Sequence, residues 1–355
     1  MPDKIVISGW YGYGNIGDEA ILAALIELFH QQYGENCNVV VLSFRPKYTK
    51  LTHNVKAVDQ LPSTFRGWIK SIITLRIFPT LIAMMLCDRF VLGGGGFLTD
   101  WQPEAPLQWL SQARLAKLFG KYTMLFGIGC GPFTTTRGKT ITRNYINKYI
   151  DKVTVRDIYS YKALIDDVGV DHKKIEITQD PAFSLNIQNS QGITRKNIIG
   201  INLVELFKFR SFTGGEGKYI KYLNDLKELV MFLQLEFPNY ELVFVPLFTK
   251  DSEFVYDSFH NDFPSIKVLN INNYQELIKC LYGLKFFIGT RFHSLVFAIK
   301  TDTPLFGLVY HPKSLAVCEE YQIPFDVIND GSFPPLENKD LELVLIEEQL
   351  RKLIP

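Results

Sequence analysis

The sequence has no marked excess of charge of either sign. Its 355 residues carry 38 Lys and Arg against 37 Asp and Glu, which gives a formal net charge of +1. General affinity for nucleic acid depends on a positive field that recruits phosphates, and this balance does not supply one. The sequence therefore predicts that nucleic acid is not a partner.

Cysteine is also scarce, with five in the chain and no C-x-x-C pair. An odd number without paired spacing indicates neither a disulfide framework nor a zinc site. The first residues, MPDKIVISGW, enter a predicted strand directly and do not resemble a signal peptide. We therefore expect reduced thiols, no bound metal and a cytoplasmic protein. The sequence does not indicate an oligomeric state.

No apolar run is long enough to span a membrane. Residues 69–87 are strongly apolar, but Lys70, Arg76 and Pro79 interrupt them. We favour a pair of helices packed into the core ahead of the next strand. The alternative is a basic amphipathic helix over 65–78 that lies on a membrane surface, peripheral at the inner membrane face.

Short apolar runs that alternate with longer helical patterns dominate the chain, and 47% of its residues are apolar. The length suits two α/β domains. Three early strands, expected at Ile5–Gly9, Arg89–Leu92 and Met124–Phe126, are followed by glycines that we expect to turn the chain tightly. Alternation of this kind predicts parallel sheets covered by helices.

A polar stretch over 186–197 is the expected linker between the two domains. A second series of strands follows it, the first over 198–204, after which Gly214–Gly217 is expected to form a mobile loop. We therefore predict an N-terminal Rossmann-like domain over 1–185, a C-terminal one over 186–335 and a helix within 336–355. The two domains are expected to face each other across a cleft.

The turn G-Y-G-N-I-G at residues 12–17 matches the dinucleotide-binding pattern G-x-G-x-x-G between a strand and a helix. No acidic residue for a ribose follows the next strand. Arg45 stands nearby and suits a 2′-phosphate, so NADP stays open as an alternative. Asp18 and Glu19 would repel a pyrophosphate at the helix start, which disfavours NAD(P). The turn is still expected to bind a ligand, because it ends the first strand of an open α/β sheet.

The second half contains a basic group between a strand and a helix. A buried strand ends at Gly289, and a helix is expected to begin near Ser294, so Arg291, His293 and Ser294 lie in the connecting turn. Helix amides and an arginine together form an anion site, and His293 is able to transfer a proton near neutral pH. Lys313 follows the next strand and is expected to reach the same ligand. A purely structural role for the histidine is the less favoured alternative.

Six motifs, taken together and in order, resemble the polysaccharide pyruvyltransferase family. They cover roughly residues 5–315 and read Gly12-x-x-Asn15-x-Gly17-Asp18-Glu19, Gly93–Gly96, Gly127-Ile128-Gly129-Cys130-Gly131-Pro132, Val155-Arg156-Asp157, Asp180-Pro181-Ala182 and Thr290-Arg291-Phe292-His293-Ser294. The resemblance implies a bacterial enzyme of GT-B-like fold that acts on capsules, exopolysaccharides or cell-wall polymers. The family transfers a pyruvyl group from phosphoenolpyruvate (PEP) to two hydroxyls of a sugar, forms a ketal and releases phosphate.

The resemblance also implies roles for individual residues. Catalysis falls to His293, as general acid, and Arg291. The donor PEP would be bound on the C-terminal side by Arg156, Arg291, Ser294 and Lys313. The acceptor, free or lipid-linked, would be bound on the N-terminal side by Asn15, Asp18, Glu19, Gly95 and Gly96. The His311-Pro312 pair ahead of Lys313 departs from the family pattern.

Two alternatives from other classes stay open. A nucleotide-sugar glycosyltransferase on the same scaffold would need a carboxylate for the donor ribose, and Glu319 and Glu320 are available. A lectin-like or regulatory protein without chemistry is disfavoured, because a binding protein has little need of Arg291, His293 and Lys313 together.

Overall fold

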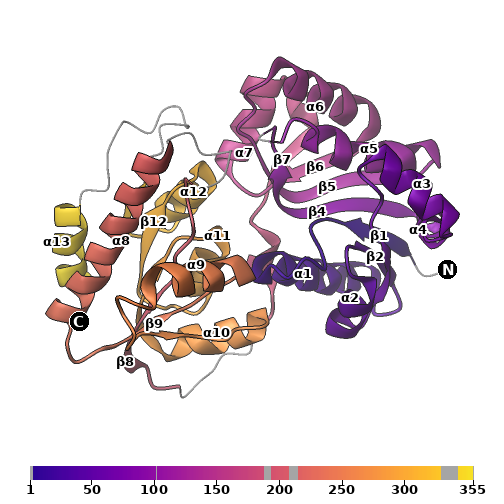
Figure 1. The fold of residues 1–355 in the computed structure, drawn as a ribbon. Helices are drawn as coiled ribbons and strands as arrows, with labels where there is room; N and C mark the ends of the chain where they lie inside the picture. The colour runs from indigo at the N-terminus through magenta and orange to yellow at the C-terminus, as the bar shows by residue number, and fades with distance from the viewer. Residues whose placement is uncertain (1–2, 101, 188–192, 208–214, 329–342, 355) are drawn as a thin grey trace. The chain divides into compact units, whose positions relative to one another are not determined.

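The computed structural model describes residues 3–100, 102–187, 193–207, 215–328 and 343–354. The chain divides into two compact units, Met1–Asn186 and Ile187–Pro355, here called unit 1 and unit 2. Each unit has its own parallel sheet and its own hydrophobic core (Figure 1). The predicted pair of Rossmann-like α/β folds is therefore confirmed.

Unit 1 is built on a sheet of seven parallel strands in the order β3-β2-β1-β4-β5-β6-β7. The strands are β1 (Lys4–Ser8), β2 (Asn38–Ser43), β3 (Lys56–Asp59), β4 (Arg89–Leu98), β5 (Tyr122–Cys130), β6 (Lys152–Val155) and β7 (Ile175–Ile177). The helices are α1 (Ile16–Tyr33), α2 (Pro46–His53), α3 (Phe65–Ile73), α4 (Ile77–Leu86), α5 (Ala105–Leu118), α6 (Thr136–Tyr149) and α7 (Ile158–Lys162), with short turns η1 (Ala163–Val168), η2 (His172–Lys174) and η3 (Pro181–Ser184).

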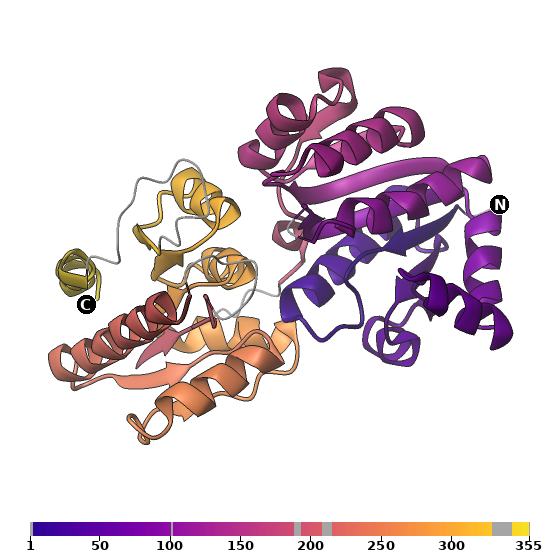
Figure 2. The ribbon, with the colours of Figure 1, turned by 45° about the horizontal axis from the view of Figure 1, so that its top comes forward.

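Unit 2 repeats this plan with six parallel strands in the order β10-β9-β8-β11-β12-β13. The strands are β8 (Lys196–Ile201), β9 (Glu241–Phe244), β10 (Lys267–Val268), β11 (Leu284–Gly289), β12 (Leu305–Val309) and β13 (Phe325–Val327). The helices are α8 (Gly215–Glu236), α9 (Thr249–Phe259), α10 (Tyr274–Gly283), α11 (Phe292–Lys300), α12 (Pro312–Glu320) and α13 (Leu343–Leu353). Figure 2 shows helices on both faces of each sheet.

In each sheet the chain adds strands first toward one edge and then toward the other. The change falls between β1 and β4 in unit 1 and between β8 and β11 in unit 2. Open parallel sheets bind ligands outside the carboxyl ends of the strands at such a switch point. Residues that follow β1, β4, β8 and β11 therefore lie where each unit is expected to bind a ligand.

The glycines after β1 turn the chain as expected, with a φ of +79° at Gly12, but those after the next two strands do not. Gly93–Gly96 continue β4, and Gly127 and Gly129 lie within β5. The glycines of β4 are required by the close approach of α1. A Cβ atom at Gly94 would stand 2.0 Å from Cγ2 of Ile21, and one at Gly93 would stand 2.4 Å from Cδ1 of Leu25.

The expected core-packed helix pair is only half realised. Helix α4 buries Ile77, Thr80 and Met84, whereas α3 buries none of its residues. The prediction was wrong for most of α3: Trp68 is partly buried and packs against the core of unit 1, but the other large apolar side chains of the helix are exposed. Among the described residues no single helix is long and apolar enough to cross a membrane, although α3 and α4 pass that test as a pair bent by 94°.

Three smaller expectations meet a mixed outcome. Gly215–Gly217 begin α8 instead of forming a loop, while Gly214 lies outside the described residues. The middle of the expected linker, residues 188–192, is also outside them. All five cysteines are free thiols, as expected, and burial raises the pKa of Cys318 to about 12.

Candidate active site

The predicted donor-side residues of unit 2 lie at the switch point, and Asn202 organises that edge. Asn202 follows β8, and its Nδ2 donates to the carbonyl of Val245, beyond the end of β9 (2.9 Å). Its Oδ1 accepts the backbone N–H of Arg291, beyond the end of β11 (3.0 Å). The Thr290 hydroxyl donates to the Asn202 carbonyl (2.6 Å). These bonds join the ends of three strands and fix the turn that carries Arg291.

The Arg291 side chain is held by Asp251, a buried residue in the first turn of α9. Arg291 Nε donates to Oδ2 of Asp251 (2.6 Å), and Nη2 donates to Oδ1. The Phe248 ring lies beside the guanidinium, with its centroid 5.7 Å from Cζ. A two-point pair of this kind fixes the plane of a guanidinium. Asp251 was missed by the sequence analysis, and its only local signal is an acidic residue at the start of a helix after a strand.

Tyr310 joins this group from the end of β12. Burial raises the pKa of its hydroxyl, Arg291 acts to lower that pKa and Asp251 acts to raise it, with a net increase. The phenol is therefore neutral at neutral pH. The opposed influences of Arg291 and Asp251 indicate that all three side chains form one electrostatic cluster at the carboxyl edge of the sheet.

Helix α11 begins at Phe292, two residues earlier than expected, and Arg291 is its N-cap. Ser294 is fully buried, and its hydroxyl donates to the Arg291 carbonyl (2.6 Å). His293 lies in the first turn, with its ring edge-to-face against Phe292 (centroids 5.1 Å apart). Ser294 thus stabilises the helix start, while the partly exposed His293 stands two residues beyond the held arginine.

Lys313 follows β12, which pairs in parallel with β11, so Arg291 and Lys313 come after neighbouring strand ends as predicted. Helix α12 starts at Pro312, and His311 caps it because its Nδ1 accepts the backbone N–H of Lys313 (3.2 Å). The His311-Pro312 pair, which departs from the family pattern, thus forms the start of the helix that carries Lys313.

In unit 1 the glycine turn after β1 is internally bonded. Glu19 is buried, and its carboxylate accepts the backbone N–H of Gly12 (2.7 Å) and shares a hydrogen bond with Nε2 of His53 (2.8 Å). Arg45 Nε donates to the Gly12 carbonyl (2.5 Å). An amide that a dinucleotide phosphate would use is therefore already satisfied, which argues against NAD(P). The Glu19 carboxylate points into the turn.

The other predicted acceptor-side residues meet where α1 starts and β4 ends. Asn15 caps α1, since its Oδ1 accepts the backbone N–H of Gly17 (3.0 Å). Asp18 is partly exposed, and its Oδ1 would lie 3.4 Å from a Cβ atom at Gly95. Gly95 is buried and Gly96 is exposed. The structure thus brings Asn15, Asp18 and these two glycines to one edge of the sheet.

Arg156 belongs to unit 1, whereas Arg291 and Lys313 belong to unit 2. It follows β6, and its Nη1 donates to Oδ2 of Asp180 (2.8 Å) while its Nε lies 3.5 Å from Oδ2 of Asp157. All three side chains are at least 96% buried. The second carboxylate oxygens cap two helical turns, since Asp157 accepts from Ser160 N–H and Asp180 accepts from Ala182 N–H. Two of the motifs are therefore joined in a buried ionic network.

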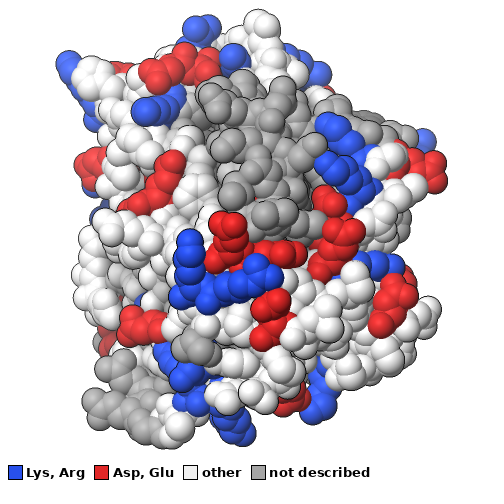
Figure 3. Space-filling view, turned by 90° about the vertical axis from the view of Figure 1, so that its left-hand side faces the viewer, with Lys and Arg blue, Asp and Glu red and all other residues white. Residues whose placement is uncertain are grey.

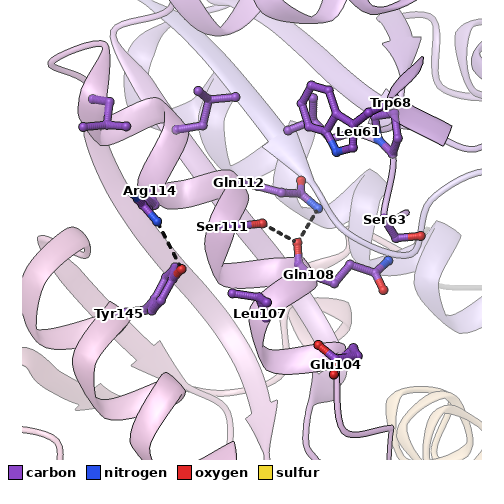
Figure 4. A pocket seen from close by; sticks show the side chains of 13 residues that line it. Leu61, Ser63, Trp68, Glu104, Leu107, Gln108, Ser111, Gln112, Arg114 and Tyr145 are labelled. Atoms are coloured by element: carbon purple, nitrogen blue, oxygen red, sulfur yellow. Dashed lines mark hydrogen bonds between the residues drawn. The ribbon is translucent and has the colours of Figure 1, made fainter. Parts of the chain in front are cut away.

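A pocket of about 520 Å³ opens in unit 1 between α3, α5 and α6 (Figure 4). Trp68 stands on one side, and Gln108 and Gln112 of α5 stand in the middle. Gln112 Oε1 accepts the hydroxyl of Ser8, the last residue of β1 (2.7 Å), which connects the pocket to the switch point. None of the predicted site residues lines this pocket, and no local sequence pattern indicates it, because its walls come from three separate helices and the segment 61–63.

One face of the molecule carries charges of both signs. On the face shown in Figure 3, acidic and basic side chains lie interspersed, without a broad area of one sign among the coloured residues. The part of the chain that the structure describes contains no group of three or more His, Cys, Asp or Glu side chains able to hold a metal ion.

Comparison with solved structures defines the type of fold. The chain resembles two-domain α/β enzymes of the GT-B-like type, at 10–13% identity. It matches S. aureus MnaA in complex with UDP (TM-score 0.62, 12% identity, 99% of this chain and 89% of that one). It also matches Neisseria meningitidis UDP-GlcNAc 2-epimerase bound to UDP-GlcNAc (TM-score 0.58, 13% identity, 99% and 90%). A third match is Anabaena Alr3699/HepE with UDP and glucose (TM-score 0.51, 11% identity, 99% and 98%).

A family comparison goes further than the fold. Residues 15–312 match the model of the polysaccharide pyruvyl transferase family, so the chain belongs to that family and to a class of transferases. The match includes Arg291 and His293 and ends one residue before Lys313. Curated proteins gave no significant match.

Proposed function

We propose that the protein transfers a pyruvyl group from phosphoenolpyruvate to two hydroxyls of a saccharide, with a cyclic ketal and phosphate as products. One observation carries the proposal. Arg291 is fixed in a single orientation by Asp251 at the switch point of unit 2, and Lys313 follows the neighbouring strand. Two cationic groups and two helix starts at one sheet edge suit a small dianionic or trianionic donor.

PEP presents a carboxylate and a phosphate a few bonds apart. A planar guanidinium binds either group through two parallel hydrogen bonds, while an ammonium acts as a point charge. We assign Arg291 to the two-point contact and Lys313 to the second anionic group. Asp251 balances the charge of Arg291 when the site is empty and orients the guanidinium.

The chemistry needs a proton at the methylene carbon of PEP. In this scheme His293 donates it, which makes C2 electrophilic. One acceptor hydroxyl adds at C2, the C–O bond to phosphate breaks and the second hydroxyl closes the ketal. The two hydroxyl protons are released, one restoring His293 and the other leaving with phosphate, so no water is consumed. A positioned acid of this kind contributes about a hundred- to ten-thousandfold in rate.

The acceptor is assigned to the carboxyl edge of unit 1. Asp18 is the proposed base for a hydroxyl, because its carboxylate is partly exposed beside Gly95, whereas Glu19 is buried. Asn15 and the backbone of Gly95 and Gly96 supply polar contacts for a sugar. Family membership supports a polysaccharide or its precursor as the acceptor.

A nucleotide-sugar glycosyltransferase is the competing function. It would need a carboxylate at the donor ribose, and the positions of the two candidate glutamates do not support that role. Glu319 and Glu320 are exposed in the last turn of α12. Lys313 is in the first turn, and six residues at 1.5 Å each separate its backbone from that of Glu319 by about 9 Å along the helix. The glutamates therefore lie at the end of α12 away from the carboxyl edge of the sheet.

Incubation of the protein with PEP and a panel of cell-surface oligosaccharides tests the proposed function. We expect acceptor-dependent phosphate release, together with a pyruvyl ketal detected on the sugar by mass spectrometry and NMR. Arg291→Ala is the control and should release no phosphate. Sugar transfer from a UDP-sugar, with PEP inert, would overturn the proposal.

A further inference from the structure

Helices α3 and α4 expose a concentration of large apolar side chains on unit 1. Of the twenty large hydrophobic side chains that are exposed in the described part of the chain, nine lie within residues 65–86. We call this the α3–α4 surface, and its apolar members are Phe65, Ile69, Ile72, Ile73, Leu75, Phe78, Ile82, Met85 and Leu86. Single exposed apolar residues need no explanation, but a group of this size marks an interaction site.

The spacing of these residues places them on one side of each helix. On α3 they recur at 65, 69, 72 and 73, and on α4 at 78, 82, 85 and 86, which in each case is one side of a helix. The two helices are joined by only three residues and contact each other. Figure 1 shows them together at one side of unit 1.

The fold fixes the opposite side of α4. Ile77 and Met84 are buried in the core of unit 1, and the Thr80 hydroxyl donates to the carbonyl of Asp59 at the end of β3 (2.7 Å). Phe65, by contrast, is 80% exposed and Ile73 is 74% exposed. The contacts of α4 with the core hold its backbone in place, so the exposure of the apolar side chains is a fixed property of the folded unit.

The charges within the α3–α4 segment itself are all positive, and the acidic neighbours are Asp59, which pairs with Arg76, and Asp88, which follows the segment. Residues 61–87 contain Arg66, Lys70 and Arg76 and no Asp or Glu. Arg76 pairs with Asp59, while Arg66 and Lys70 are exposed between the apolar residues of α3. Basic side chains interleaved with exposed apolar ones complement an anionic lipid surface.

The dimensions favour docking in the plane of a bilayer over crossing it. At 1.5 Å a residue, α3 and α4 are about 14 and 15 Å long, roughly half the hydrocarbon thickness. They meet at 94°, and one side of α4 is already committed to the protein core. Helix α4 cannot extend into the membrane without pulling Ile77 and Met84 out of that core.

We propose that the α3–α4 surface docks unit 1 on the face of an anionic lipid bilayer, with α3 in the interface. A second copy of the chain fits less well as the occupant. Self-pairing would bring Arg66 and Lys70 of both copies together without an acidic residue from either segment, and like charges oppose such contacts. This inference does not depend on the proposed reaction.

Flotation of the full chain with vesicles tests the proposal. Vesicles of phosphatidylcholine alone are compared with vesicles that contain phosphatidylglycerol. The charge variant is Arg66→Glu/Lys70→Glu, and the apolar variant is Phe65→Ser/Ile69→Ser/Ile73→Ser. The matched control for the apolar variant is Ile220→Ser/Met231→Ser/Leu235→Ser, which removes three exposed apolar side chains from α8. All the substituted positions are exposed, so thermal unfolding should be unchanged and is recorded for each variant.

We expect the wild type and the α8 control to float with the anionic vesicles and to partition at least about tenfold more weakly into neutral ones. Both α3 variants should lose at least about tenfold in partitioning. Wild-type protein that stays in the soluble fraction with both vesicle types would overturn the proposal. So would a self-associated wild type that the apolar variant converts to a monomer without any vesicle binding.

Discussion

Asp251 and Arg291 form a two-point ion pair across 40 residues of sequence, with Oδ2 of Asp251 2.6 Å from Nε of Arg291. Asp251 comes from the helix after β9, and Arg291 comes from the turn after β11. The aspartate side chain is 2% exposed and the arginine side chain 23% exposed. The pair therefore anchors a partly accessible guanidinium on a buried carboxylate, so that a cation is oriented before a ligand arrives.

Asp251→Asn should weaken both stability and PEP binding. Removing one partner of a buried pair leaves the other charge uncompensated, and the residual exposure of Arg291 places the expected cost near the lower end of the range, at about 3 kcal/mol. PEP affinity should fall at least about tenfold, because the guanidinium loses its fixed orientation. Thermal unfolding and PEP titration measure the two effects. Asp257→Asn, an exposed residue of the same helix, is the control, and equal effects of the two substitutions would contradict the assignment.

His293→Ala should separate chemistry from binding. We expect turnover to fall by about a hundred- to ten-thousandfold while PEP affinity changes little, because the proposed role of the imidazole is proton donation. Single-turnover phosphate release and PEP titration measure the two quantities. His311→Asn is the matched control, since asparagine retains the capping function of His311 at the start of α12. A His293→Ala enzyme that keeps most of its turnover would remove the acid assignment.

Gly94→Ala should destabilise unit 1 because of the contact between α1 and β4. The added methyl would stand 2.0 Å from Ile21 Cγ2, and the backbone φ of +57° adds strain. A loss of about 3 kcal/mol or more is expected in denaturant unfolding. Gly120→Ala separates the two causes, since Gly120 also has a positive φ (+73°) but nothing lies within 4 Å of its Cβ position. If the two variants lose equal stability, the close approach of α1 is not the reason for the glycine run.

Arg156→Met is expected to act on folding. It would leave the carboxylates of Asp157 and Asp180 buried without their cation, at a cost of about 3–5 kcal/mol. Arg137→Met is the control: Arg137 is 61% exposed and pairs with Glu104, so its loss should cost less than about 1 kcal/mol. Thermal unfolding compares the two variants. A normally stable Arg156→Met protein that fails to bind PEP would restore the donor-binding role that the family resemblance implies.

Most of the fold could be predicted from the sequence, but less of the candidate site. The buried strand β11 was predicted to end at Gly289, where it does end, because an apolar run closed by glycine indicates a central strand directly. The edge strands β3 and β13 were not predicted, since they have only four and three residues and are only partly buried. Strand order and the switch points follow from pairings between distant segments, which no local pattern contains.

The same limit explains the site. Arg291 and Lys313 follow strands with clear signals, and the rule that parallel strands end at one edge brought them together correctly. Asp251 was missed because only the tertiary fold brings it to Arg291. The glycines of β4 were misinterpreted because the helix that requires them lies more than 60 residues earlier in the chain, at Ile21 and Leu25.

Calorimetric titration of PEP, and separately of UDP, into the wild type and Arg291→Ala tests the central claim most directly, because it needs no acceptor. The account predicts saturable heat from PEP with the wild type, loss of that heat in Arg291→Ala and no heat from UDP with either protein. Saturable heat from UDP, with none from PEP, would contradict it and would identify the edge of unit 2 as a nucleotide site.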